Sequence, residues 1–173
     1  YYGQILVLTF PIIGIYGVPG NDKDPYGLLK YFESNKIHIK GLIISDYSDT
    51  YEHYQAIQSL GKWLKQHDVP GLYCMDTRQL TKKIREEGTM LCKIEFENQK
   101  IDFWDPNTEN LSNYVSVKHE YMIVNKKITN KNIIVIDCGI KNSILRKLLE
   151  YDINVIVIPW DYDFTIIHPF LKE

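Results

Sequence analysis

A short polar turn contains the residues best placed for chemistry. Residues 137–141, Asp-Cys-Gly-Ile-Lys, follow a β-branched run at 133–136 and precede an amphipathic helical pattern. In open α/β sheets, ligands bind outside the carboxyl ends of the strands, which is where this turn lies. Lys141 at the mouth of the helix faces the positive end of the helix dipole, which is unfavourable unless the lysine meets an anion. The pattern predicts an anion contact for Lys141, with a solvated lysine as the alternative.

The spacing of the other reactive side chains disfavours further chemistry. Cys138 has isoleucines two positions away on both sides, Ile136 and Ile140, whereas a nucleophile on a tight strand-to-helix elbow needs small residues there. Cys74 and Cys92 have no histidine within short sequence reach. The five histidines are scattered without C-x-x-C or H-x-x-x-H spacing. We therefore predict no catalytic residue and no metal site in this chain. A single glycine in the turn also disfavours a dinucleotide site.

The elements around this turn predict a βαβ unit. Residues 133–136 read as a strand buried on both faces, typical of a central parallel strand. Residues 142–151 carry apolar positions at helical spacing, and 155–158 form a second apolar run that Pro159 closes. A right-handed crossover would make the two strands parallel. This is the opening of a doubly wound α/β domain.

The residues before this unit predict a separate layer of mixed strands and helices. Residues 4–10 and 37–44 read as strands, and 91–96 with 100–104 as a hairpin. Asp24-Pro25 reads as the start of a helix that ends near Asn35. Two further helices are predicted, one capped by Ser59 and one running from Asp76 or Thr77 to a glycine cap at Gly88.

Composition limits the class of protein and of partner. The chain has 173 residues, 45% of them hydrophobic and 24% charged, with a net charge near -2. That balance argues against electrostatic binding to nucleic acid or to a membrane surface. No apolar run approaches the roughly 18 to 20 residues of a membrane span. Three widely spaced cysteines predict reduced thiols and a cytoplasmic location.

Chain organisation predicts two domains. The polar, lysine-rich stretch 125–132 reads as a linker between a domain at 1–124 and a second one at 133–173. The first predicted strand begins almost with the chain, and few residues follow the last one. Because a doubly wound domain needs more strands to cover its sheet, we expect the chain to be truncated at both ends.

Several stretches together resemble one enzyme family. DCGIKNSILRKLL followed by VIVIPWDYDF resembles the start of the class I glutaminase domain of carbamoyl phosphate synthetases, particularly the fused animal and protist forms. QILVLTFPIIGIYGVP resembles the first strand and turn of the family's amino-terminal domain. YGLLKYFESNKIHIKGLIISD resembles a segment of the fused eukaryotic enzymes, and LGKWLKQHDVPGLYCMDTRQLTKKIREEGTM resembles the family's most recognisable stretch. FWDPNTENLSNYVSV resembles the run that precedes the glutaminase domain. The segments occur in the family's order and cover nearly the whole chain.

This resemblance implies a fold and a function. The fold would be α/β, with a mixed β/α swivelling-type amino-terminal domain followed by the truncated start of a doubly wound class I glutaminase domain. The parent would be a glutamine-dependent carbamoyl phosphate synthetase of pyrimidine synthesis. A cysteine, histidine and glutamate triad frees ammonia from glutamine, and the synthetase region joins it to bicarbonate using ATP and magnesium. The triad is absent here, so this chain alone would be inert, with the synthetase region as its partner.

The resemblance also assigns roles to single residues. Lys141 matches the lysine of the family's D-x-G-x-K turn and would supply a cation near the substrate carboxylate or the catalytic cysteine. Gly139 would keep that turn compact. No other role is carried over from the resemblance. From their residue types and positions, Asp76 and Thr77 are expected to cap a helix. Arg78 is expected to form a surface or interface salt bridge, with contact to the synthetase portion as the alternative.

Three other functions stay open at this point. In ammonia-dependent relatives the catalytic cysteine is replaced and the domain serves as a scaffold, and the residue that distinguishes them lies beyond Glu173. A free-standing protein-interaction module is the second alternative. A nucleotide-binding α/β domain is the third.

Overall fold

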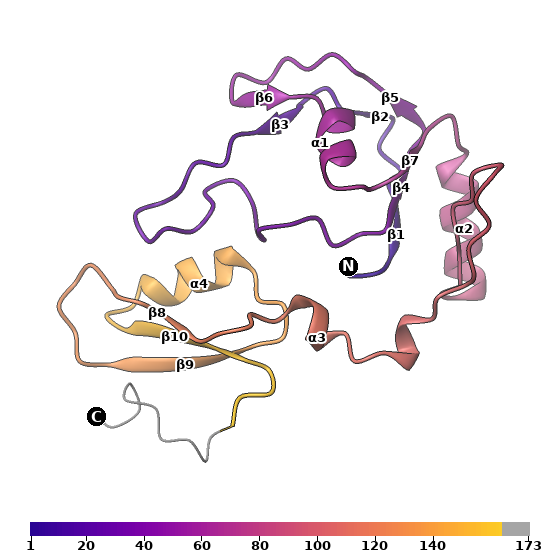
Figure 1. The fold of residues 1–173 in the computed structure, drawn as a ribbon. Coiled ribbons are helices and arrows are strands. Elements are labelled where there is room, and N and C mark those ends of the chain that lie inside the picture. The colour runs from indigo at the N-terminus through magenta and orange to yellow at the C-terminus, as the bar shows by residue number, and fades with distance from the viewer. Residues whose placement is uncertain (164–173) are drawn as a thin grey trace. The chain divides into compact units, whose positions relative to one another are not determined.

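The chain contains two compact units. The computed structural model describes residues 1–163 (Figure 1). Unit 1 comprises residues 1–22 and 30–109, and unit 2 comprises Lys23–Leu29 together with the residues from Asn110 on. The chain therefore enters unit 2 briefly at residues 23–29, returns to unit 1, and passes to unit 2 again after residue 109.

Unit 1 is built on a parallel three-stranded sheet. Its strands are β1 (Ile5–Val7), β4 (Gly41–Ile43) and β7 (Gly71–Leu72), in the order β1-β4-β7. Helix α1 (Leu60–Gln66) begins at Ser59, whose side chain accepts a hydrogen bond from the Lys62 amide at 3.4 Å, as predicted. The buried core of this unit contains Leu42, Ile44, Leu64 and Val69. The helix thus supplies an apolar side chain to the strands.

Shorter strand pairs extend unit 1. β2 (Ile12–Ile13) pairs in parallel with β5 (Asp46–Tyr47), and β3 (Val18–Pro19) pairs antiparallel with β6 (Ala56–Gln58). The parallel and antiparallel pairs together confirm a mixed α/β fold. Only part of the strand predicted at 4–10 forms a ladder, because β1 ends at Val7.

Helix α2 is the best-delimited helix of unit 1. It spans Thr77–Glu87 and begins at Asp76, whose carboxylate accepts a hydrogen bond from the Gln79 amide at 2.9 Å. It ends at Gly88, which has a φ of +84°. Side-chain capping of the first amides and a glycine after the last turn are the signals from which this helix was predicted. The prediction is confirmed.

Unit 2 contains the predicted βαβ unit. Strands β9 (Asn132–Asp137) and β10 (Asn154–Pro159) are parallel and joined by helix α4 (Asn142–Leu149). β8 (Tyr121–Ile123) pairs antiparallel with β10, so the strand order is β8-β10-β9. Figure 1 shows α4 lying along one face of this sheet. Its apolar stripe packs there, and the buried cluster consists of Ile123, Leu145, Leu149, Val155 and Val157.

The expected burial of β9 on both faces is wrong. Ile134 and Ile136 are 38% and 51% exposed, whereas Val155 to Ile158 of β10 are at most 3% exposed. The strand order explains the difference, because β10 lies between its neighbours and β9 lies at an edge within the described residues. Both strands have the same β-branched composition, so their position in the sheet decides their burial.

The predicted helix from Asp24 to Asn35 is also wrong. The Asp24 carboxylate accepts hydrogen bonds from the amides of Tyr26 at 2.9 Å and Leu28 at 3.0 Å, and Gly27 has a φ of +81°. Lys23 and Leu29 form an antiparallel bridge. Aspartate favours both helix caps and local turns, and here it closes a loop. Leu28 packs on the core of unit 2.

The segment between α2 and β8 is largely irregular. In place of the predicted hairpin at 91–104 there is an isolated bridge between Phe96 and Gln99. A 3-10 turn, η1, spans Pro106–Thr108, and a short helix, α3, spans Ser112–Val115. No helix within residues 1–163 combines the length and the apolar character needed to cross a bilayer.

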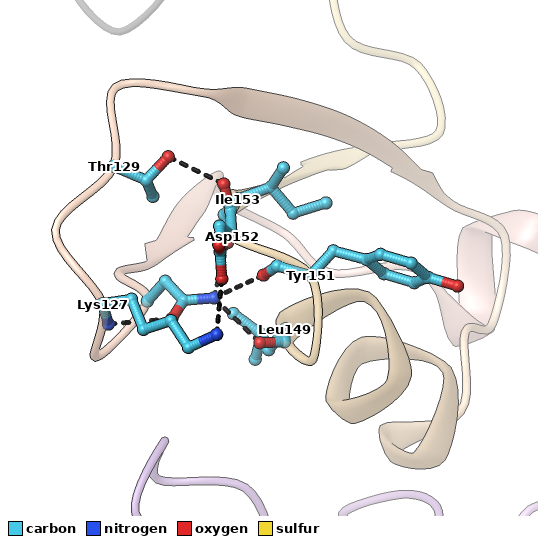
Figure 2. Close-up of polar contacts among 7 residues, drawn as sticks. Lys127, Thr129, Leu149, Tyr151, Asp152 and Ile153 are labelled. Carbon is cyan, nitrogen blue, oxygen red and sulfur yellow. Dashed lines mark hydrogen bonds and ion pairs between the residues drawn. The ribbon is translucent and has the colours of Figure 1, made fainter.

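Residues 125–132 connect β8 to β9 within unit 2 and do not lie between the two units. Thr129 Oγ1 donates to the carbonyl oxygen of Asp152 at 2.7 Å, and Lys127 Nζ pairs with the Asp152 carboxylate at 2.7 Å (Figure 2). The structure thus divides the chain after residue 109, whereas the sequence predicted domains at 1–124 and 133–173. Residues 164–173 of that second domain lie outside the described part.

Candidate functional site

Asp137 anchors the turn at the carboxyl end of β9. Its side chain is buried, at 3% exposure. Oδ1 accepts hydrogen bonds from the amides of Gly139 and Ile140, both at 2.8 Å, and Oδ2 accepts from the Val117 amide at 2.8 Å. Bonds from amides to a carboxylate are stronger than bonds between neutral groups. Asp137 was not predicted as a site residue, although an aspartate two residues before a glycine is a turn signal.

Gly139 occupies a backbone conformation that side chains rarely adopt. Its φ is +98°, and a Cβ added there would lie 3.1 Å from Val115 Cγ2. Both the dihedral angle and the close neighbour favour glycine at this position. The turn is therefore compact for a physical reason, while a part for Gly139 in substrate binding stays a prediction.

Lys141 stands at the N-terminal end of α4 with an exposed side chain. It is the N-cap residue, with φ -83° and ψ 144°, and its side chain makes no capping hydrogen bond. No acidic residue lies in the first turn of the helix. Within residues 1–163 its ammonium group forms no ion pair. The described residues place no anion beside this lysine, so the anion contact predicted for Lys141 stays a prediction that only a bound ligand would fulfil.

The segment 113–117 joins the ends of β9 and β10. Asp137 and Pro159 are partners in the parallel ladder, so the carboxyl ends of both strands lie at the same edge. Trp160 follows β10 there, its amide donating to Ser116 Oγ at 3.0 Å and its indole Nε1 donating to Asn113 Oδ1 at 3.1 Å. These contacts were not predicted, because they join residues far apart in the sequence.

Besides Asp137 and Lys141, a phenol and a thiol lie near this edge, those of Tyr121 and Cys138. Burial raises the pKa of the Tyr121 phenol, and the negative charge of Asp137 raises it further, so the phenol stays protonated at neutral pH. Cys138 is exposed and free, as are Cys74 and Cys92. No group of three or more histidine, cysteine, aspartate or glutamate side chains within residues 1–163 is placed to hold a metal ion.

The three residues singled out at the start of α2 have different environments. Asp76 is the N-cap, as predicted. The cap predicted for Thr77 is wrong, because Thr77 is the first helical residue. It is 1% exposed, and its hydroxyl lies 2.7 Å from Ser45 Oγ. Arg78 is exposed and forms no salt bridge within the described residues. Thr77 therefore fastens the helix to the strand layer of unit 1.

Comparison with known proteins identifies the family. Residues 1–94 match the family described as carbamoyl-phosphate synthase small chain, CPSase domain. The chain belongs to this family. The similarity to curated relatives extends beyond unit 1, and their alignments cover 94–98% of this chain.

Relatives of very different lengths contain a region similar to this chain. The chain is 48% identical over 166 residues to the human mitochondrial carbamoyl-phosphate synthase (ammonia), covering 95% of this chain and 11% of the relative. It is 47% identical over 176 residues to multifunctional protein pyr1-3 of Dictyostelium discoideum, covering 94% and 8%. It is 41% identical over 175 residues to the arginine-specific carbamoyl phosphate synthase small chain of Eremothecium gossypii, covering 98% and 44%. The chain thus spans less than half the length of each relative.

Proposed function

We propose that this chain is the small-chain region of a glutamine-dependent carbamoyl phosphate synthetase, which takes ammonia from glutamine to form carbamoyl phosphate. The observation that carries the proposal is the turn 137–141, where an exposed Lys141 meets a helix N-terminus without an anion beside it. The matched family and the names of the human and Eremothecium gossypii relatives support carbamoyl phosphate synthesis for the parent protein.

Unit 2 would then be the start of a class I glutaminase domain with a doubly wound sheet. The parallel βαβ unit and the position of the turn at the carboxyl ends of its strands support this. Lys141 and the helix dipole would act on the same negative group, either the glutamine carboxylate or a catalytic thiolate. A favourable dipole contact is worth about 0.3–1 kcal/mol.

The remaining machinery would lie elsewhere in the parent enzyme. We place the binding of ATP and magnesium in the synthetase region of the same protein, which would also be the partner of unit 1. The cytoplasm and pyrimidine synthesis are the proposed setting. Because no triad is recognised in this chain, it would release no glutamate by itself. Glutamate release above the buffer rate when the chain is incubated with glutamine would contradict that statement.

An ammonia-dependent enzyme is the second candidate. The relative with 48% identity carries the word ammonia in its name. In such an enzyme unit 2 would serve as a scaffold, and Lys141 would have no substrate to bind.

The nitrogen donor decides between the two candidates. The experiment measures carbamoyl phosphate formed by the full-length protein that carries this chain, with ATP, magnesium and bicarbonate and with glutamine or ammonium chloride. The proposal predicts product with either donor. Product with ammonium chloride alone would contradict glutamine dependence and favour the second candidate. Glutamate release in the same samples shows whether glutamine is hydrolysed.

A further inference from the structure

Residues 23–29 are part of unit 2 although unit 1 flanks them in the sequence. Tyr26 and Leu28 pack against the buried cluster that includes Leu145 and Leu149 of α4. The ammonium group of Lys126 lies 5.9 Å from the centre of the Tyr26 ring. This segment, the 23–29 loop, is therefore seated on the core of unit 2 by apolar side chains and a cation–π contact.

An arginine of α4 fastens the 23–29 loop. Arg146 Nη1 donates to the carbonyl oxygen of Leu29 at 3.1 Å and lies 3.5 Å from Asp24 Oδ2. The Asp24 side chain is 9% exposed and that of Arg146 is 30% exposed, so water screens the pair less than it screens a surface ion pair. The other oxygen of Asp24, Oδ1, accepts the amides of Tyr26 and Leu28. Asp24 thus closes the loop with one oxygen and binds the helix with the other.

Arg146 is five residues after Lys141, between one and two turns along the helix that Lys141 begins. A short helix moves as a rigid element, so a contact that fixes Arg146 also limits the movement of Lys141. We propose that the 23–29 loop clamps α4 and thereby places Lys141 for glutamine, with Arg146 as a positioning residue. The second half of this inference rests on the proposed function.

Single substitutions can remove the contact between the loop and α4 while leaving the neighbouring interactions in place. Asp24→Asn keeps an Oδ1 that can accept the two loop amides but replaces the anion facing Arg146. Arg146→Met keeps an unbranched, largely apolar stem and removes the guanidinium group with its charge. Lys147→Met is the matched control, because Lys147 is on the same helix, is 68% exposed and pairs with Glu150. Within residues 1–163, Lys147 forms no hydrogen bond or ion pair with the 23–29 loop.

The experiment compares these variants in the full-length protein with two readouts. The first is hydrogen exchange of the α4 amides, which reports local opening of the helix. Loss of a charge-assisted contact should speed exchange about tenfold in Asp24→Asn and Arg146→Met and leave Lys147→Met like the wild type. The second is the KM for glutamine, which should rise roughly three- to tenfold while the ammonia-supported rate is unchanged.

The outcomes are distinguishable. If the α4 amides of Asp24→Asn and Arg146→Met exchange as slowly as those of the wild type, the proposal that the 23–29 loop clamps α4 is overturned. Faster exchange with an unchanged KM for glutamine would overturn the positioning role and leave a contact that only stabilises unit 2. If the wild type uses ammonia alone, the proposed function and the positioning role fail together, while the exchange data still support or overturn the clamp.

Discussion

The side-chain amide of Asn125 donates to the carbonyl oxygen of Leu149 at 2.8 Å and so closes the C-terminal end of α4. The same nitrogen lies 2.8 Å from the carbonyl oxygen of Tyr151 and 3.0 Å from that of Ile153. Its own backbone amide donates to Asn154 Oδ1 at 2.9 Å. Figure 2 shows the lysine-rich loop after β8 beside the carbonyl groups that follow the helix. This loop is therefore an integral part of unit 2.

Asn125→Asp should destabilise unit 2 strongly. The substitution places a carboxylate against three carbonyl oxygens and the negative end of a helix dipole, at a position 7% exposed. We expect a loss of about 2–4 kcal/mol in the free energy of unfolding, measured by urea denaturation. Asn130→Asp is the control, because Asn130 is exposed in the same loop. Equal stability of the two variants would show that the amide contributes little.

Gly139→Ala should distort the turn that carries Lys141. At a φ of +98° a side chain costs about 1–3 kcal/mol, and the new methyl group would also meet Val115 Cγ2 at 3.1 Å. Adding Val115→Ala removes the contact but not the backbone strain. The double variant should therefore lose less free energy of unfolding than the two single variants lose together. Gly139→Ala should still lower the free energy of unfolding in the Val115→Ala background, because the backbone strain remains. A neutral Gly139→Ala in thermal unfolding would contradict the strained turn.

His38 should make unit 1 sensitive to mild acid. Burial, with a contribution from the charge of Lys36, lowers the pKa of His38 from its ordinary 6.5. Nε2 lies 2.8 Å from Ser34 Oγ, while Nδ1 is buried without a partner within residues 1–163. The unfolded chain therefore binds a proton at His38 more tightly than the folded chain does. The contribution of neutral His38 to the stability of the folded state is complete above pH 6.5 and is lost as the pH falls towards the lowered pKa of the folded state.

The measurement for His38 is the urea midpoint of unit 1 between about pH 7.5 and pH 5, for the wild type and for His38→Gln. The wild type should lose stability over this range more steeply than the variant, whose side chain does not titrate. Parallel pH profiles would assign the acid sensitivity to other groups.

Local patterns were sufficient to predict the βαβ unit and two of the helices. The β-branched runs in β9 and β10 and the helical spacing of apolar residues in α4 depend only on neighbouring residues. The same holds for the caps at Ser59, Asp76 and Gly88, which are read from residue types at the helix ends. Lys141 was found in this way, because its position follows directly from a strand and a helix that are both local.

Non-local contacts explain what the sequence did not reveal. Asp24-Pro25 suits a helix start as well as a turn, and the packing of Leu28 on the core of unit 2 accompanies the turn. Strand order, which exposes Ile134 and Ile136 of β9, is not encoded in the composition of a strand. The loop after β8 is polar like a linker, and only its partners after α4 show that it is fixed in place.

The most direct test of the glutamine-binding role uses Lys141→Met and Lys141→Arg in the full-length protein. The measurement is the KM for glutamine in carbamoyl phosphate formation, with the ammonia-supported rate of each variant as internal reference. Loss of a cation beside a bound carboxylate predicts a KM at least about tenfold higher for Lys141→Met, partial recovery in Lys141→Arg and an unchanged ammonia-supported rate. A KM for glutamine equal to that of the wild type in Lys141→Met would contradict the role assigned to this turn.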